Sequence, residues 1–280
     1  MLVELAIGDA YGAGFEYADG YFVEAHNDLS GYFQHPSYSV RPGCYTDDTQ
    51  MSIAVAEAIV SGQKWTRELL AAKFVAAFKR DPHTGYAGGF YAFLVEVSDG
   101  QRFLAQIGGN SDKSGAAMRA APLGIFPTVS EVLDKCRLQA AITHNTSDGI
   151  NAACAAALMS HYFIYQLGPK EELGKFLEKH LPGNWTKIWR GEVGSKGWMS
   201  VQAAITAVIA NDKMSDLLRN CIAFTGDVDT VATIALGAAA NCLQIEQDLP
   251  AALLGDLENG RYGRDFLIKL DQNLMNLVKR

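Results

Sequence analysis

Apolar residues recur every three or four positions along most of the chain, which is the spacing of one face of an α-helix. The pattern is strong over residues 46–60, where Thr46 stands as an N-cap and Gly62 follows the last apolar residue. Residues 66–80 show the same pattern and stop shortly before a proline. The other segments with helical spacing are 132–142, 149–167, 171–180, 198–210, 215–224, 230–245 and 264–278.

Runs in which apolar and polar residues alternate, as expected of a half-buried β-strand, are few. Alanine is abundant in the apolar segments, and small side chains let helices approach closely. Glycine and proline are spread evenly, and no stretch has the composition of a flexible linker. We therefore predict an all-α fold in which residues 1–280 form one domain.

Length and charge limit the class of protein. With 280 residues and 49% hydrophobic content, the chain can bury a large core. The formal charge of −7 argues against a nucleic-acid-binding surface, which would cluster Lys and Arg, but it leaves a nucleotide pocket open. The apolar N-terminus is too short to span a membrane and lacks the features of a signal peptide. We expect a cytoplasmic protein without a membrane partner.

A hydroxyl and two adjacent carboxylates stand at the start of the helix predicted for residues 46–60, in the sequence YTDDTQ. Side chains of a first turn can converge on a point beyond the helix end, and oxygen ligands suit a hard divalent cation. Thr46, Asp47 and Asp48 are therefore candidate metal ligands. The alternative is ordinary N-capping, with acidic residues favoured in the first turn, and this cluster alone leaves both interpretations open.

A second cluster repeats this chemistry directly ahead of another apolar helix, where Asp227, Asp229 and Thr230 follow Gly226. Together the two clusters supply carboxylates and hydroxyls enough to hold two metal ions and leave positions for a substrate. Two unrelated capped helices are the alternative. We predict that the clusters converge on one central dinuclear site, although they lie far apart in the chain.

A third element is the glycine-rich run GDAYGAGFE, residues 8–16. It is not a dinucleotide-binding fingerprint, because no strand precedes it and the glycine spacing is wrong. Its glycines would instead allow close backbone packing near a site. Glu16 at its end is either a ligand or acid/base residue or an ordinary surface glutamate.

Three motifs, GDAYGAGFE, YTDDTQM and GDVDTVATIALGAAA, resemble in order and form those of the ADP-ribosylglycohydrolase family. This family includes dinitrogenase-reductase-activating glycohydrolases and ADP-ribosyl-arginine and ADP-ribosyl-serine hydrolases. Two weaker matches lie between them. Residues 114–124 are similar to the family's Asn-Gly-x-Ala-Met-Arg loop, and Thr143-His144 is similar to its Thr-His step.

The resemblance implies an all-α fold, a single compact multi-helix orthogonal bundle with two Mg²⁺ or Mn²⁺ ions at its centre. It also implies that Glu16 is the family's mobile acidic residue near the scissile bond. The implied metal ligands are Thr46, Asp47, Asp48, Asp227, Asp229 and Thr230. The implied substrate-binding residues are Ser114, Gly115 and Ala116 at the diphosphate and His144 near the riboses.

Two residues near this loop raise separate questions. Ser114 stands where the family usually has Asn, and this departure leaves open the polar contacts of the loop and the linkage preference. Asp112 is a candidate second catalytic acid/base beside the substrate, with a role outside the site as the alternative.

The reaction implied by the resemblance is hydrolysis of the C1″ glycosidic bond of an ADP-ribosylated protein or small molecule. One alternative is a two-metal phosphohydrolase, which would release AMP from a nucleotide substrate. Another is a non-catalytic ADP-ribose-binding protein, although the presence of all six proposed ligands argues against it. The residues leave open the linkage, the physiological metal and the oligomeric state.

Overall fold

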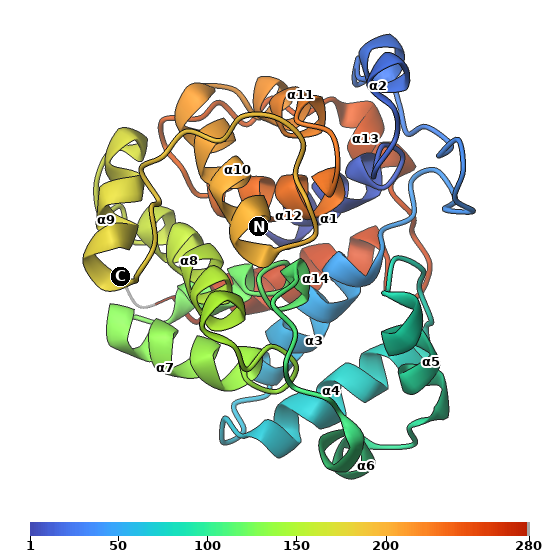
Figure 1. Ribbon diagram of the computed structural model, residues 1–280, viewed down its shortest axis with the longest axis vertical. Helices are drawn as coiled ribbons and strands as arrows, with labels where there is room; N and C mark the ends of the chain where they lie inside the picture. Colours follow the sequence, from blue (N-terminus) through green and yellow to red (C-terminus); the bar gives the residue numbers. More distant parts are fainter. Residues whose placement is uncertain (279–280) are drawn as a thin grey trace.

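The structure, a computed structural model, describes residues 1–278 and is all-α, as predicted. Among these residues there is no β-strand, only isolated bridges between single residue pairs. Figure 1 shows how the helices are arranged. The elements are α1 (Leu2–Gly12), α2 (Gly20–His26), α3 (Asp47–Val60), α4 (Arg67–Arg80), α5 (Gly88–Glu96), α6 (Gly100–Gln106), η1 (Ser114–Ala116), η2 (Ala121–Ile125), α7 (Val129–Ala140), α8 (Ser147–Ile164), η3 (Lys170–Glu172), α9 (Leu173–His180), α10 (Gly197–Ala210), α11 (Met214–Ala223), α12 (Val228–Ala239), α13 (Ala251–Asp256) and α14 (Arg264–Met275).

Three predicted helices end about a turn or more earlier than expected: 149–167 ends at Ile164, 264–278 ends at Met275, and 230–245 falls short by the most. The apolar spacing predicted a helix over residues 230–245, but α12 ends at Ala239. The chain tightens there into a turn in which the Cys242 N–H donates to the Ala239 carbonyl. Cys242 and Ile245 are nevertheless buried, so they continue the apolar spacing beyond the end of the helix.

Helix α1 is not among the predicted helices, because glycine has low helix propensity. Its glycines face α12 in direct contact. A Cβ added at Gly8 would lie 2.7 Å from the Ala232 carbonyl oxygen, and one added at Gly12 would lie 2.4 Å from the Asp229 Cα. Only glycine permits this approach. It brings the end of α1, and Glu16 beyond it, beside the start of α12.

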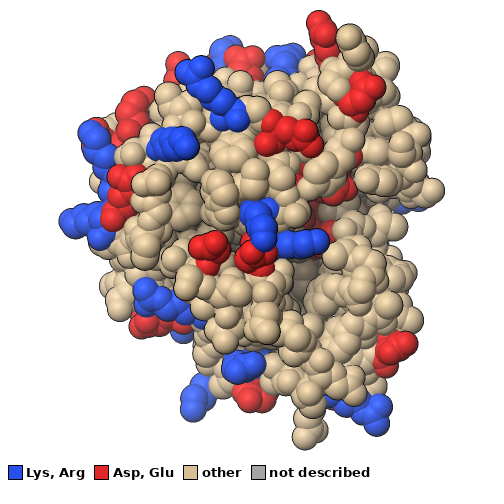
Figure 2. Space-filling view, viewed as in Figure 1, with Lys and Arg blue, Asp and Glu red and all other residues tan. Residues whose placement is uncertain are grey.

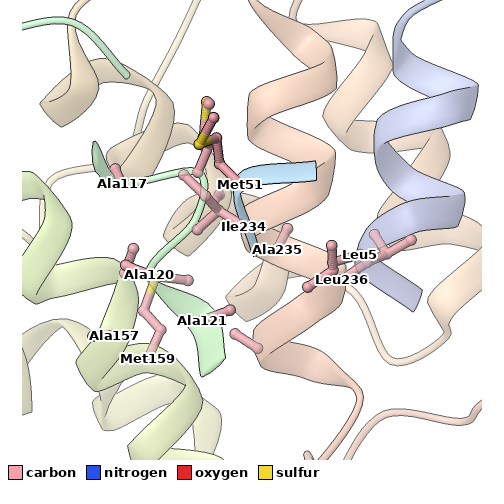
Figure 3. Close-up of a cluster of buried hydrophobic side chains, with 14 of the residues drawn as sticks. Leu5, Met51, Ala117, Ala120, Ala121, Ala157, Met159, Ile234, Ala235 and Leu236 are labelled. Atoms are coloured by element: carbon pink, nitrogen blue, oxygen red, sulfur yellow. The ribbon is translucent and has the colours of Figure 1, made fainter. Parts of the chain in front are cut away.

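Helix α12 lies at the centre of the core, where it contacts α1, α3, α8, α10 and α11 (Figure 1). All 12 of its residues are buried. Figure 3 shows Leu5 of α1 near Leu236 of α12, with Ala120, Ala121 and Ala157 nearby. Because a helix buried on every side has no solvated face, the acidic residues of its first turn are buried as well.

The buried apolar side chains form one cluster that runs from Met1 to Leu274. Helices α4, α5 and α6 join it through contacts of α4 with α3, and they lie together in Figure 1. Within residues 1–278, no helix combines the length and apolar character needed to cross a membrane.

Candidate active site

A cavity of about 400 Å³ is lined by the first turns of α3 and α12, the loop after α1, and the segment around η1. Figure 2 shows a hollow with acidic side chains inside it and basic side chains along its edge. Segments from both ends of the chain therefore meet at one place. The predicted site residues that line the cavity are Glu16, Asp47, Asp48, Ser114, Gly115, His144, Asp227, Asp229 and Thr230.

Asp9 of α1 holds the start of α3 in place. Its carboxylate accepts hydrogen bonds from the N–H and hydroxyl of Thr46, at 2.9 and 2.7 Å. It also accepts from the N–H and hydroxyl of Thr49, at 2.9 and 2.5 Å. Thr46, the N-cap of α3, is buried by these contacts. Asp9 is not among the site residues predicted from the sequence. An acidic residue within a mostly apolar run could have indicated a buried, functional carboxylate.

Asp47 and Asp48 line the cavity from the first turn of α3. Burial, and then the nearby carboxylate of Asp9, raise the pKa of both well above the ordinary range. Asp48 Oδ2 is buried and has no hydrogen-bond partner among the described residues. The carboxylate of Asp47 is in close contact with Gly85, since a Cβ added at Gly85 would lie 2.3 Å from Asp47 Oδ1. An unpaired buried carboxylate oxygen is costly, so Asp48 fits the role of a cation ligand.

Asp227 is held by hydrogen bonds at the N-cap of α12. Gly226 has a φ of +86°, and a Cβ there would lie 2.0 Å from the Val193 carbonyl oxygen, so the turn requires glycine. The Asp227 N–H donates to that carbonyl at 2.9 Å. The Ser200 hydroxyl donates to the Asp227 carboxylate at 3.2 Å. Burial raises the pKa of Asp227, and hydrogen bonds from neighbouring hydroxyls counteract this shift.

Glu16, Asp227 and Asp229 form a compact acidic group, in which one carboxylate oxygen from each lies within 4.8 Å of the others. Burial, and then Asp227 and Asp9, raise the pKa of Glu16 to about 7. Burial and the Glu16 charge raise the pKa of Asp229 well above its ordinary value. Carboxylates this close repel one another, and oxygen ligands suit a divalent cation. The residues present therefore fit a metal site.

A further wall of the cavity comes from the segment around η1. Ser114 and Gly115 line it, whereas Ala116 is fully buried behind them. Gly115 is in contact with His144, because a Cβ there would lie 3.2 Å from the His144 Nε2 atom. Burial, and then the Arg119 guanidinium, lower the pKa of His144 to about 3, so this ring is neutral at pH 7.

The structure places Asp112 outside the set of residues that line the cavity. Its carboxylate accepts a hydrogen bond from Lys196 Nζ, and this pairing lowers the pKa of Asp112. A paired carboxylate of low pKa is a poor proton acceptor, so the geometry lends no support to the predicted catalytic role. Its neighbour Lys113 does line the cavity, and the side chain of Lys113 has no polar partner within residues 1–278.

Fold and site together define a class: an all-α protein in which two helix starts and a loop bring buried carboxylates to one cavity suited to a metal. The sequence profile of the family described as ADP-ribosylglycohydrolase matches residues 1–280. The chain belongs to the ADP-ribosylglycohydrolase family, which confirms the resemblance of its motifs.

Three curated relatives illustrate the breadth of the similarity. ADP-ribosylhydrolase ARH3 of Homo sapiens is 29% identical over 183 residues, covering 58% of this chain and 50% of its own. ADP-ribosylarginine hydrolase Tri1 of Pseudomonas putida (strain GB-1) is 26% identical over 267 residues, covering 89% and 71%. ADP-ribosyl-[dinitrogen reductase] glycohydrolase of Rhodospirillum rubrum is 24% identical over 268 residues, covering 91% and 87%. The matches span about half the length of the ARH3 relatives from Xenopus tropicalis and Homo sapiens.

A solved structure shares the fold. A chain described as "ADP-ribosylglycohydrolase-related protein complex" superposes with a TM-score of 0.75 at 21% sequence identity. The superposition covers 99% of this chain and 96% of that chain. At this identity the likeness concerns the all-α fold, and the chemistry has to be argued from the site.

Proposed function

We propose that this protein is a metal-dependent hydrolase that cleaves the C1″ glycosidic bond of an ADP-ribosylated protein or small molecule and releases ADP-ribose. The observation that carries the proposal is the gathering of buried carboxylates in one cavity of a member of this family. The names of the three relatives agree with it, because each is a hydrolase of an ADP-ribosyl group. We also propose that residues 1–280 act as one domain, since both ends of the chain contribute to one core.

Two Mg²⁺ or Mn²⁺ ions are the proposed cofactors. Bound in the cavity, they would supply Lewis acidity and a fixed point for the hydroxyls of the distal ribose. The unpaired Asp48 Oδ2 and the acidic group of Glu16, Asp227 and Asp229 support this. Thr46 lies behind the cavity lining, where its hydroxyl donates to Asp9 and accepts from the Asp48 N–H at 3.5 Å, which leaves one lone pair for a metal. The proposed ligands are Thr46, Asp47, Asp48, Asp227, Asp229 and Thr230.

The other residues of the cavity would orient the substrate and move a proton. Cleavage at C1″ builds positive charge on the ribose, and nearby carboxylates stabilise that charge. Glu16 is partly exposed at the edge of the acidic group, where it can exchange a proton with a reacting water. Ser114 and Gly115 lie where a loop contacting the diphosphate would lie, beside His144. Lys113 in the same lining would offset part of the phosphate charge.

Two rival functions use the same residues. A two-metal phosphohydrolase would place the carboxylates around phosphorus and split the pyrophosphate. A non-catalytic ADP-ribose-binding protein would use the cavity without turnover. Membership of a family described as ADP-ribosylglycohydrolase favours cleavage at the sugar over the phosphohydrolase alternative.

Product analysis tests the proposal. The protein would be incubated with Mg²⁺ and peptides carrying ADP-ribosyl-arginine or ADP-ribosyl-serine, and the products would be identified by mass spectrometry, with EDTA as the control. We expect intact ADP-ribose in at least one reaction and none with EDTA. AMP as the main product would support the phosphohydrolase, and binding without any product would support the non-catalytic alternative.

A further inference from the structure

A buried cation without a carboxylate partner lines the cavity beside His144. Arg119, between η1 and η2, is 1% exposed and forms no ion pair within residues 1–278. Its Nε donates to Gln139 Oε1 at 2.8 Å, and its guanidinium carbon lies 4.5 Å from the centre of the Phe74 ring. Burying a guanidinium is costly. Besides a second bond, from Arg119 Nη2 to the Gln139 carbonyl oxygen at 3.4 Å, the guanidinium has one further contact with an acceptor.

That contact is with Thr143. Arg119 Nη2 donates to the Thr143 hydroxyl oxygen at 2.9 Å, and the same oxygen lies 2.7 Å from His144 Nδ1. A guanidinium has only hydrogens to offer, so the hydroxyl accepts from it. Within the described residues, the only other hydrogen-bond partner of this hydroxyl is Nδ1. Thr143 also lines the cavity, and Nδ1 is the only acceptor that the described residues place within reach of its hydroxyl hydrogen. Donation to Nδ1 is therefore the direction that satisfies both groups within the protein.

The direction of this hydrogen bond determines the tautomer of His144. In a neutral imidazole one nitrogen carries the hydrogen and the other accepts, so Nε2 carries the hydrogen here. Nε2 is on the side of the ring that faces Gly115 in the cavity lining, 3.2 Å from the place of an added Cβ. Gly149 supports the ring from another side, since a Cβ there would lie 2.9 Å from His144 Cβ.

We propose that Arg119 and Thr143 are positioning residues that hold His144 in its Nε2–H tautomer, so that the ring presents a fixed, uncharged hydrogen-bond donor to an oxygen of the substrate. His144 then binds an acceptor such as a phosphate or sugar oxygen and does not act as a proton acceptor. The cation supports this by disfavouring a second positive charge nearby, and the pKa of Arg119, lowered by burial to about 10, still leaves it charged at pH 7. The role toward substrate rests on the proposed function, whereas the tautomer does not.

Nitrogen NMR of the full-length protein labelled with ¹⁵N-histidine tests the tautomer without any substrate. Spectra would be recorded with and without Mg²⁺, and the His144 signals would be identified by their loss in His144→Asn. We expect an unprotonated, hydrogen-bonded Nδ1 and a protonated Nε2 from pH 6 to pH 8. A protonated Nδ1 in the wild-type protein would overturn the proposal.

Thr143→Val removes the hydroxyl and keeps the shape of the side chain. We expect the His144 signals to shift to a mixture of tautomers, and Thr143→Ser to restore the wild-type signals. The matched control is Thr233→Val, because the Thr233 hydroxyl is buried, has no hydrogen-bond partner within residues 1–278 and lies outside the cavity lining. Thr233→Val should leave the His144 signals unchanged, and an unchanged tautomer in Thr143→Val would also overturn the proposal.

Kinetics with an ADP-ribosylated peptide test the role toward substrate. Losing one oriented hydrogen bond should raise the KM of Thr143→Val about tenfold, with kcat changed less than about twofold and Thr143→Ser close to wild type. An unchanged KM despite an altered tautomer would overturn the substrate role. If the wild-type protein turns over no such peptide, the proposed function fails, and the NMR result still decides the tautomer.

Discussion

The first turns of α3 and α12 carry similar residues, yet they are held in different ways. At α3, the hydrogen bonds of Asp9 fix the backbone and the threonines, while Asp48 Oδ2 has no partner among the described residues. At α12, the Ser200 hydroxyl bonds the carboxylate of Asp227 itself. In the α3 cluster, Asp9 holds the backbone and the threonines but forms no hydrogen bond with the acids that line the cavity. In the α12 cluster, a protein hydroxyl bonds one of the acids, Asp227, directly.

This difference predicts different dependence on a cation. The pKa of Asp48 is well above its ordinary value because burial and neighbouring charges both raise it. The pKa of Asp227 is raised by burial, but hydrogen bonds lower it in part. Asp48, with a single hydrogen bond from Thr230 that lowers its pKa, therefore depends more on a metal than Asp227, whose carboxylate several hydrogen bonds stabilise. Asp229 of the α12 cluster resembles Asp48, because burial and neighbouring carboxylates raise its pKa well above the ordinary value.

Removing an acid at α12 should have the largest effect. Asp229→Ala should lower kcat/KM at least about a hundredfold, because a lost ligand disturbs every substrate contact made through the metal site. The fold should persist, since one of several like charges is removed. Activity on an ADP-ribosylated peptide and circular dichroism measure both. Asp134→Ala, at an exposed position of α7, is the control and should keep full activity. Near wild-type turnover by Asp229→Ala would refute the assignment.

Adding metal should stabilise the folded protein by the next largest amount. Binding to the native state alone contributes about 2.7 kcal/mol per site when free Mg²⁺ is a hundred times its Kd. The melting temperature should therefore rise with Mg²⁺ concentration and fall on addition of EDTA. Asp48→Asn should reduce the rise more than Asp227→Asn if Asp48 depends more on the cation. A melting temperature independent of Mg²⁺ and Mn²⁺ would argue against a metal site.

Disturbing the support behind α3 should have a smaller effect. Asp9→Asn replaces an acceptor of four hydrogen bonds with a group that also donates, so Thr46 and Thr49 lose part of their anchoring. Second-layer partners of metal sites typically change affinity by about 10- to 100-fold. We expect Mg²⁺ affinity, measured by calorimetry, to fall within that range. An affinity equal to that of the wild type would show that Asp9 is not needed to position the α3 cluster.

The two acid clusters could be predicted from sequence because each is local. Caps, acids and apolar spacing lie within a few residues of one another at Thr46 and at Asp227. Helix α1 and Asp9 could not be predicted in the same way. Their positions depend on contacts of Gly8 and Gly12 with α12 and on hydrogen bonds to α3, which link distant parts of the chain.

Dependence on distant contacts also explains why the sequence did not reveal that the carboxylate of Asp112 is paired. Its partner Lys196 lies 84 positions away, and nothing local marks the pairing that occupies its carboxylate. The Arg119–Thr143–His144 contacts also join residues whose sequence context gives no sign of the connection. Local patterns therefore predicted which elements carry the chemistry, whereas the supporting hydrogen bonds required the fold.

The metal-free protein should lose stability as pH rises. Glu16, with a pKa raised to about 7, and the aspartates stay protonated in the folded state over a range in which the unfolded chain has lost those protons. The folded state is therefore penalised progressively from about pH 4 to beyond pH 7. In EDTA, the melting temperature should be lower at pH 8 than at pH 5, and Mg²⁺ should reduce the difference. A melting temperature that rises over this range in EDTA would contradict the electrostatics of the cavity.

Weakening the support at α12 should have the smallest effect. Ser200→Ala removes the hydroxyl that donates to Asp227 at 3.2 Å, but the backbone N–H bond to Val193 remains and keeps the N-cap in place. One hydrogen bond contributes about 1 kcal/mol, so kcat/KM should fall about fivefold. Ser160→Ala is the matched control, since the Ser160 hydroxyl is buried without a partner among the described residues and its loss should leave kcat/KM unchanged. A fall in kcat/KM of Ser200→Ala as large as the hundredfold loss expected of Asp229→Ala would mean that the α12 cluster depends on this one hydrogen bond for its position.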